Sequence, residues 1–116
     1  MDLLKKLQIP PGTRVFLVDA PDGFKIGLQL SKSEKKNAAV LMFAANSKKL
    51  GKNARVAIEA ARTGRLSWIA YPKAGQLGTD LNRDKLQELM KRFGIEGVRL
   101  VSVDDVWSAM RFRPKK

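Results

Sequence analysis

The chain has 116 residues, a length typical of one domain, and its 44% hydrophobic and 29% charged residues exclude a mostly disordered protein. Cysteine and histidine are both absent, which excludes disulfides, thiolate zinc sites and catalysis by either side chain. Lys and Arg number 23 against 11 Asp and Glu, and the net charge of +12 favours anionic partners. We therefore expect a single domain over residues 1–116 with no bound metal and no membrane partner. The lack of cysteine agrees with a cytoplasmic protein.

The first third of the chain predicts a helical turn and one clear strand. Three leucines near the N-terminus share one side of a short helix, which Asp2 can cap and which Pro10 to Gly12 ends. Residues 13–20 form an apolar run without alternation, as expected for a strand that is covered on both faces. Residues 24–30 fit either a strand or a short helix, and residues 31–36 predict a polar loop.

The remaining residues predict strands that alternate with helices. Apolar strands are expected at residues 38–45 and 66–71. Between them, Ser47 is expected to cap a helix that Gly64 ends. A second helix begins near residues 79–82 and ends at Gly94. Strands at 98–103 and 106–112 follow, joined by a turn so tight that they must be antiparallel.

This order predicts an α/β fold of the Rossmann-like type. We expect a mostly parallel sheet of about five strands, helices on both of its faces and a C-terminal antiparallel β-hairpin. Four tracts carry a resemblance to a known family: RVFLVDAPDGF after Pro-Pro-Gly, LSWIAYPKAG, TDLNRD and DDVWSAMRFRP. With these tracts the chain resembles an uncharacterised family of small bacterial proteins with a shortened class I S-adenosylmethionine-dependent methyltransferase fold. The resemblance implies the fold and assigns no activity.

The first loop departs from the pattern of active methyltransferases. Those enzymes have a glycine-rich loop after the first strand, whereas residues 19–23 here read DAPDG, with one glycine and with a proline that removes a backbone donor. The strand that normally supplies a ribose-binding acid is missing or shortened. We therefore expect no S-adenosylmethionine cofactor and no micromolar binding of it, although a minimal methyltransferase stays a third hypothesis.

Open α/β sheets bind ligands beyond the carboxyl ends of their parallel strands, so these ends predict the site. The predicted ligand-binding residues are Asp19, Asp22, Gly23, Ser47, Lys48 and Lys73. We expect Ser47, Lys48 and Lys73 to converge on one anion at the start of the helix, where free amides and lysines favour negative charge. The alternative for these lysines is a plain solvated surface. Asp104 and Asp105 are expected to form a hairpin turn, with a general base or an arginine partner as the alternative.

A basic helix face raises a second hypothesis. On the helix that begins at Ser47, the polar side carries four basic residues that suit nucleic-acid phosphates: Lys48, Lys52, Arg55 and Arg62. The aromatic residues give no support, because Phe16, Phe43, Trp68 and Phe93 are expected in the core and only Trp107, Tyr71 and Phe24 at the surface. The preferred hypothesis is a non-catalytic or degenerate methyltransferase-like domain that binds a small anion or a partner at the strand ends. A non-specific nucleic-acid-binding module is the alternative.

Overall fold

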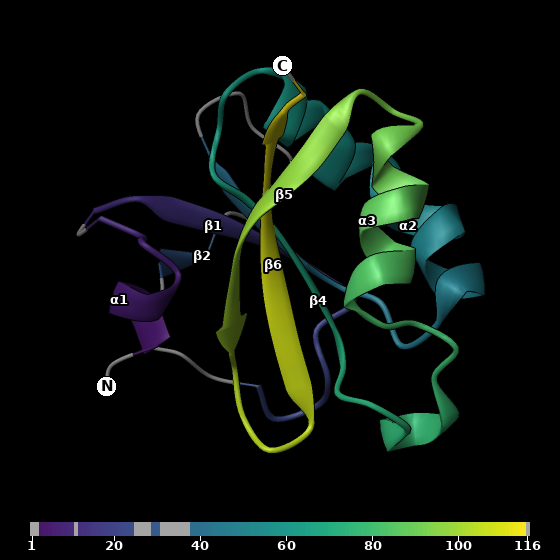
Figure 1. Ribbon diagram of the computed structural model, residues 1–116. Coiled ribbons are helices and arrows are strands. Elements are labelled where there is room, and N and C mark those ends of the chain that lie inside the picture. The colour runs from purple at the N-terminus through teal and green to yellow at the C-terminus, as the bar shows by residue number, and fades with distance from the viewer. Residues whose placement is uncertain (1–2, 11, 25–28, 31–37, 116) are drawn as a thin grey trace.

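The computed structural model describes residues 3–10, 12–24, 29–30 and 38–115, and its helices and strands follow the predicted order (Figure 1). The elements are α1 (Leu3–Lys6), β1 (Arg14–Val18), β2 (Gln29–Leu30), β3 (Ala39–Phe43), α2 (Ser47–Arg62), β4 (Ser67–Pro72), the 3₁₀ turn η1 (Gln76–Gly78), α3 (Arg83–Lys91), β5 (Ile95–Ser102) and β6 (Trp107–Pro114). Of the ambiguous segment 24–30, the last two residues form β2, and residues 25–28 lie outside the described part. The predicted loop 31–36 also lies outside it.

The six strands form one mixed sheet, with the order β2-β1-β3-β4-β6-β5. Strand β1 pairs in parallel with β2 and β3, and β3 pairs in parallel with β4. Strand β6 pairs antiparallel with both β4 and β5, and these two strands of the hairpin are the longest in the sheet. The prediction of a mostly parallel Rossmann-like sheet is therefore wrong, although the antiparallel C-terminal hairpin is confirmed.

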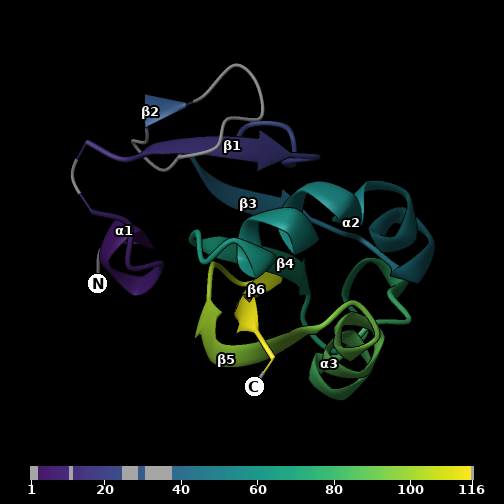
Figure 2. The same cartoon turned by 90° about the horizontal axis from the view of Figure 1, so that it is seen from above.

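The two faces of the sheet are covered unequally. Helices α2 and α3 both pack on one face, in a cluster that contains Met42, Ile69 and Met110 from neighbouring strands. The opposite face packs against α1 and the segments around it, in a second cluster built on Phe43 and Trp68. Figure 2 shows the same arrangement, with α1 on the opposite side of the sheet from α2 and α3. Both long helices thus share one face, whereas the predicted Rossmann-like fold distributes its helices over both faces.

Strands β3 and β4 form the buried centre of the sheet, as their sequences predict. Every residue of both strands is buried, because the alternate side chains of each strand enter the two clusters. The single buried polar side chain among the described residues is Ser67, whose hydroxyl donates to the Ala57 carbonyl of α2 over 2.7 Å. This bond satisfies the hydroxyl and fixes α2 against β4.

Asparagines begin both long helices. The side chain of Asn46 accepts from the Lys49 amide at 2.9 Å, and that of Asn82 accepts from the Lys85 amide at 2.8 Å. The prediction that Ser47 caps α2 is therefore wrong by one residue, since Ser47 is the first helical residue. Asparagine and serine are about equally good caps, so the sequence alone did not separate them.

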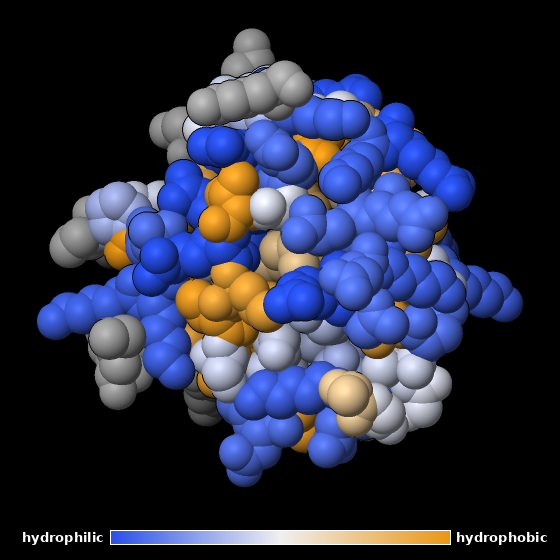
Figure 3. Space-filling view, in the orientation of Figure 1, coloured by the Kyte–Doolittle hydropathy of each residue, from blue (hydrophilic) through white to orange (hydrophobic). Residues whose placement is uncertain are grey.

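The surface also corrects two expectations about aromatic residues. Phe93 is 44% exposed rather than buried, whereas Trp107 and Tyr71 are buried rather than exposed. The face in Figure 3 is mostly hydrophilic, with hydrophobic atoms over β5, the strand that carries the exposed Val98 and Leu100. In the part of the chain that the structure describes, no helix combines the length and the hydrophobicity needed to cross a membrane.

Gly97 gives a stability prediction because β5 passes close to the core at this point. A Cβ on Gly97 would lie 2.4 Å from Met110 Sδ and 3.3 Å from Gln87 Cδ, and Met110 is buried. We expect Gly97→Ala to destabilise the protein by about 1–3 kcal/mol, since Met110 must leave its position. The control is Gly51→Ala, where nothing lies within 4 Å of the added Cβ, and it should stabilise α2 by about 0.5–1 kcal/mol. Urea unfolding of both variants measures the difference, and equal effects would contradict it.

Candidate functional site

The carboxyl ends of the parallel strands meet at one edge of the sheet. Asp19 follows β1, Ala44 and Ala45 follow β3, and Lys73 follows β4. Strand β6 runs in the opposite direction and begins at the same edge, where Trp107 pairs with Pro72. This edge therefore gathers residues from four strands and from the first turns of α2.

A cavity of about 390 Å³ opens at this edge, between the end of β1 and α2. We call it the strand-end cleft; its lining residues are Asp19, Ala20, Pro21, Phe43, Ala45, Lys49, Lys52, Asn53 and Trp107. The volume lies within the range of small-molecule sites in proteins. The lining comes from four separate parts of the chain, so the cleft is a product of the tertiary fold.

Aromatic rings support one wall of the cleft. Phe43 lies between two other rings, with its centroid 4.8 Å from that of Phe24 and 5.1 Å from that of Trp107, both in edge-to-face geometry. Phe43 and Trp107 are buried, which fixes their orientation. Edge-to-face pairs of this kind add to the stability that burial gives, so this wall is rigid.

Lys49 and Lys52 provide positive charge on the α2 side of the cleft. Both lysines are exposed, and within the described residues neither ammonium group has a hydrogen-bond or ion-pair partner. The same helix places Asn53 one residue further on, where its Nδ2 donates to Asp19 Oδ2. Asp19 is held at a φ of 56°, a left-handed conformation that its short polar side chain tolerates. The arrangement suits a ligand with an anionic group near the lysines and polar groups near Asp19.

The start of α2 is occupied by a carboxylate of the chain itself. The Ser47 amide donates to Asp80 Oδ1 over 2.8 Å, and the Ser47 hydroxyl donates to Asp80 Oδ2. Lys85 Nζ lies 3.2 Å from the same Oδ2. Asp80 therefore takes the place at the helix N-terminus where the sequence predicts an external anion.

These contacts stabilise the ionised form of Asp80. The two hydrogen bonds from Ser47, the side-chain one first, hold the pKa of Asp80 well below its usual range, and Lys85 acts in the same direction. The folded pKa lies below the unfolded value of about 3.9, so the ionised contact stabilises the fold at neutral pH. That contribution is lost as the pH falls from about 5 towards the folded pKa.

We therefore expect Asp80→Asn to be less stable than the wild type at pH 7, with a difference that shrinks steadily between pH 5 and pH 2. Urea unfolding at a series of pH values measures it. Asp105→Asn serves as the control, because Asp105 is an exposed carboxylate in the β5–β6 turn. A difference for Asp80→Asn that is independent of pH would contradict the electrostatic explanation.

The other predicted ligand-binding residues lie apart from the cleft or at its border. Lys73 Nζ donates to Ser102 Oγ over 2.7 Å, and the Lys73 amide donates to the Val106 carbonyl. Both bonds hold Lys73 against the residues that join β5 to β6. Lys48 is exposed on α2. Asp22 and Gly23 lie exposed in the turn after β1, and neither lines the strand-end cleft. Of the six predicted residues, Asp19 lines this cleft, and Ser47 and Lys73 bond to different partners.

The four residues predicted to bind nucleic acid do not form one continuous surface. Lys48, Lys52, Arg55 and Arg62 are all exposed on α2. Lys52 lines the strand-end cleft, however, whereas Arg55 and Arg62 line a different cavity between α2 and α3. Arg55 also forms an ion pair with Glu59 at 3.1 Å, and Arg62 Nε donates to the Phe93 carbonyl over 2.7 Å. The basic side of α2 is thus shared between two concave sites.

Asn53 and Trp107 line the cleft although the sequence analysis assigned neither of them to a site, and Lys49, expected at the anion-binding start of the helix, lines the cleft instead. The 3.6-residue period of α2 places Lys49 and Asn53 on one side, and that signal was present in the sequence. Trp107 lies at the site only because β6 pairs with β4. Asp104 accepts from the Val106 and Trp107 amides, each over 2.8 Å, which confirms the predicted hairpin turn.

Comparisons of the chain with protein-family models, with curated proteins and with solved structures gave no match. Among the described residues no group of three or more acidic side chains could hold a metal ion.

Proposed function

We propose that this protein binds a small anionic ligand in the strand-end cleft. The observation that carries the proposal is the pair of exposed lysines, Lys49 and Lys52, on the wall of a concave site beside a rigid aromatic wall. Charge-assisted hydrogen bonds from such ammonium groups to a phosphate or carboxylate are about twice as strong as neutral ones. The protein would act as a binding domain in the cytoplasm, in keeping with its lack of cysteine.

The cleft favours binding over catalysis. Asp19 is the one carboxylate among the residues that line it, and the amide of Asn53 holds that carboxylate. Acid–base catalysis commonly uses two titratable groups in separate roles, and no second carboxylate lines the cleft beside Asp19. The turn 19–23 retains the proline that argues against S-adenosylmethionine, so calorimetry with this compound is expected to show no micromolar binding.

Inorganic phosphate is a suitable probe for the test. Amide chemical shifts of the wild type should respond at residues 45–53 during a phosphate titration. We expect the double variant Lys49→Glu/Lys52→Glu to weaken the binding at least tenfold, because two charged hydrogen-bond donors are replaced by repelling carboxylates.

The matched control is Lys48→Glu/Lys73→Glu, which changes the net charge by the same amount and alters no residue that lines the cleft. It should bind phosphate within about threefold of the wild type, the effect expected of exposed charges outside the cleft that salt screens. Equal losses in the two double variants would reject the cleft and leave a diffuse effect of the net charge.

Nucleic acid is a second candidate ligand, favoured by the exposure of all five basic residues of α2. Binding through phosphates is independent of base sequence, and each neutralised phosphate gives a salt slope of about −0.9 on duplex DNA. Fluorescence anisotropy with two unrelated duplexes should then show the same affinity and the same salt dependence. Lys52→Glu/Arg55→Glu should weaken both alike, and an affinity that does not change with salt would reject this candidate.

A further inference from the structure

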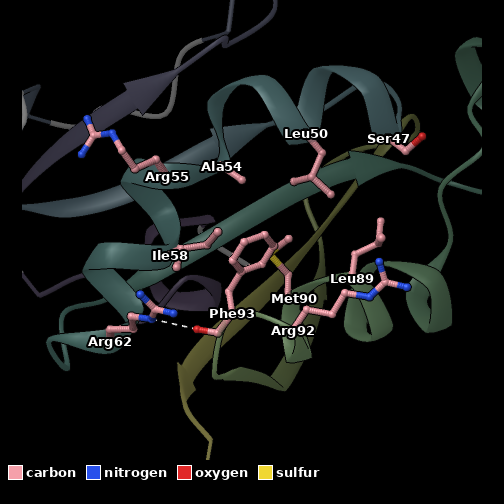
Figure 4. Close-up of a pocket in the computed structure, with 11 residues that line it drawn as sticks. Ser47, Leu50, Ala54, Arg55, Ile58, Arg62, Leu89, Met90, Arg92 and Phe93 are labelled. Atoms are coloured by element: carbon pink, nitrogen blue, oxygen red, sulfur yellow. Dashed lines mark hydrogen bonds between the residues drawn. The ribbon is translucent and has the colours of Figure 1, made fainter.

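A second cavity lies between α2 and α3, and it shares no lining residue with the strand-end cleft. Its volume is about 440 Å³, and it is open to solvent along one side. We call it the α2–α3 groove. Figure 4 shows that its side chains come from one side of α2 and from the end of α3. The groove lies on the helix-covered face of the sheet, so a ligand there would not compete directly with one at the strand ends.

The walls of the groove are apolar. Leu50, Ala54 and Ile58 recur every four residues along about 12 Å of α2, and all three are buried, so they form the floor of the groove. Met90 and Phe93 form the opposite wall, and in Figure 4 the Phe93 ring points towards α2. Phe93 lies in the turn after α3 and is 44% exposed, although phenylalanine is among the residue types most often buried. An apolar ligand would cover this ring.

The groove also has room beside α2. Gly51 is one of its lining residues, and a Cβ added there would meet nothing within 4 Å. A glycine inside an exposed helix costs about 1 kcal/mol relative to alanine. The sequence therefore retains a destabilising residue at a point where a side chain would project into the groove.

Every charged residue that lines the groove is an arginine: Arg55, Arg62 and Arg92. The contact of Arg62 Nε with the Phe93 carbonyl orients its guanidinium next to the apolar wall. Within the described residues, the terminal nitrogens of Arg62 and the whole guanidinium of Arg92 have no hydrogen-bond partner. Guanidinium groups match carboxylate and phosphate oxygens in a two-point geometry, so this rim selects an anionic headgroup.

We propose that the α2–α3 groove binds an anionic amphiphile, an unbranched alkyl chain of medium length with one carboxylate or phosphate headgroup. The chain covers the exposed Phe93 ring above the floor of Leu50, Ala54 and Ile58, and the headgroup meets Arg92, whose guanidinium lies beside Leu89 in Figure 4. A volume of about 440 Å³ is that of a small-molecule site. The arginine rim complements a negative charge, which distinguishes this ligand from a neutral lipid. The proposal is independent of the anion site at the strand ends.

The first test is a chain-length series of hexanoate, octanoate and decanoate, measured by calorimetry and by amide chemical shifts. Each further methylene that enters the groove should strengthen binding about fourfold. Shift changes should map to residues 50–62 and 89–93. Decanol should bind at least tenfold more weakly than decanoate, because it lacks the charge that the arginines bind. An affinity that does not depend on chain length would overturn the proposal.

Two variants locate the site. Gly51→Leu places a side chain in the open space of the groove and improves the helix propensity of α2, so it should fold and lose at least tenfold in decanoate affinity. Arg92→Gln should weaken decanoate about tenfold and leave decanol unchanged. Its matched control is Lys91→Gln, a neighbouring exposed residue outside the groove, which should change neither.

The remaining outcomes all count against the proposal. Equal effects of Arg92→Gln and Lys91→Gln would show that only the net charge attracts the probe. Unchanged binding in Gly51→Leu would place the ligand elsewhere. Binding of an acidic amphipathic peptide without binding of decanoate would identify a protein as the occupant.

The double variant Lys49→Glu/Lys52→Glu distinguishes the two sites. It should leave decanoate affinity within about threefold of the wild type, so that a failure of this proposal is separate from a failure at the strand-end cleft.

Discussion

Replacing Trp68 by phenylalanine is expected to destabilise the protein by about 2–4 kcal/mol. Trp68 is fully buried in β4, and its indole Nε1 donates to the Leu7 carbonyl over 2.9 Å. Leu7 follows α1, so this bond joins the N-terminal segment to the centre of the sheet. Phenylalanine removes the donor, leaves a buried carbonyl without its partner and reduces the apolar surface that is buried.

The effect should be strongest at the N-terminal segment, because the Trp68 bond joins Leu7, directly after α1, to β4. Hydrogen exchange at the Leu7 and Ile9 amides, which donate to the Leu3 and Leu4 carbonyls, should accelerate more than exchange in β3. Urea unfolding measures the global loss. Trp107→Phe is the matched control on the same face, since the Trp107 indole makes no hydrogen bond with the described residues, and it should cost about 1 kcal/mol. Equal losses in the two variants would contradict the role of the bond.

Local patterns predicted the elements, whereas the arrangement of the sheet required long-range contacts. The apolar runs around Val40 and Ile69 identified β3 and β4, since only a strand covered on both faces lacks alternation. The same runs do not specify their neighbours. Strand β6 lies next to β4 with six residue pairs from Ser67–Phe112 to Pro72–Trp107, and this pairing makes the sheet mixed. The sequence shows that the hairpin is antiparallel but not which strand it joins.

The sequence predicted the edge of the sheet where the site lies, but not which side chains contact each other there. Strand ends indicated the correct edge of the sheet, and Asp19 lines a cleft there. Asp80 is 33 residues from Ser47 in the chain, yet it supplies the anion at the start of α2. No local sequence pattern predicts a contact between residues this far apart in the chain. The 3₁₀ turn η1 and the turns that flank it determine where Asp80 lies. The exposure of Phe93 also depends on the tertiary structure, since α2 stands away from it across the groove.

The positions of the basic residues around α2 bear on the choice between a small ligand and nucleic acid. A helix turns by 100° per residue, so Lys49 and Lys52 line the cleft at the end of β1, Arg62 contacts Phe93 after α3, and Arg55 turns away from α3 to pair with Glu59. A nucleic-acid-binding surface would require these charges on one continuous face of the protein. Here they border two cavities of similar volume, one with lysines and polar groups and one with arginines and apolar walls. This chemistry supports the two proposals of small ligands over that of nucleic acid.

The second large effect is expected at Ile69, the position where the sheet changes from parallel to antiparallel. Ile69 pairs with Met42 in parallel β3 and with Met110 in antiparallel β6, and its side chain is fully buried under α2. Ile69→Ala removes three methyl or methylene groups from a site that strands surround on both sides, so the structure has little freedom to close the cavity. We expect a loss of about 2–5 kcal/mol, against about 0.5–1.5 kcal/mol for Ile69→Val.

Val98→Ala is the control for this prediction, because Val98 lies on the edge strand β5 and is 43% exposed. It should change the free energy of unfolding by less than about 0.5 kcal/mol. Denaturant unfolding followed by far-UV circular dichroism measures all three variants, and the order Ile69→Ala, Ile69→Val, Val98→Ala is the expected result. Similar losses for Ile69→Ala and Val98→Ala would mean that β4 is not the centre of the packed sheet. The strand-end cleft, whose aromatic wall depends on the pairing of β4 with β6, would then lose its support as well.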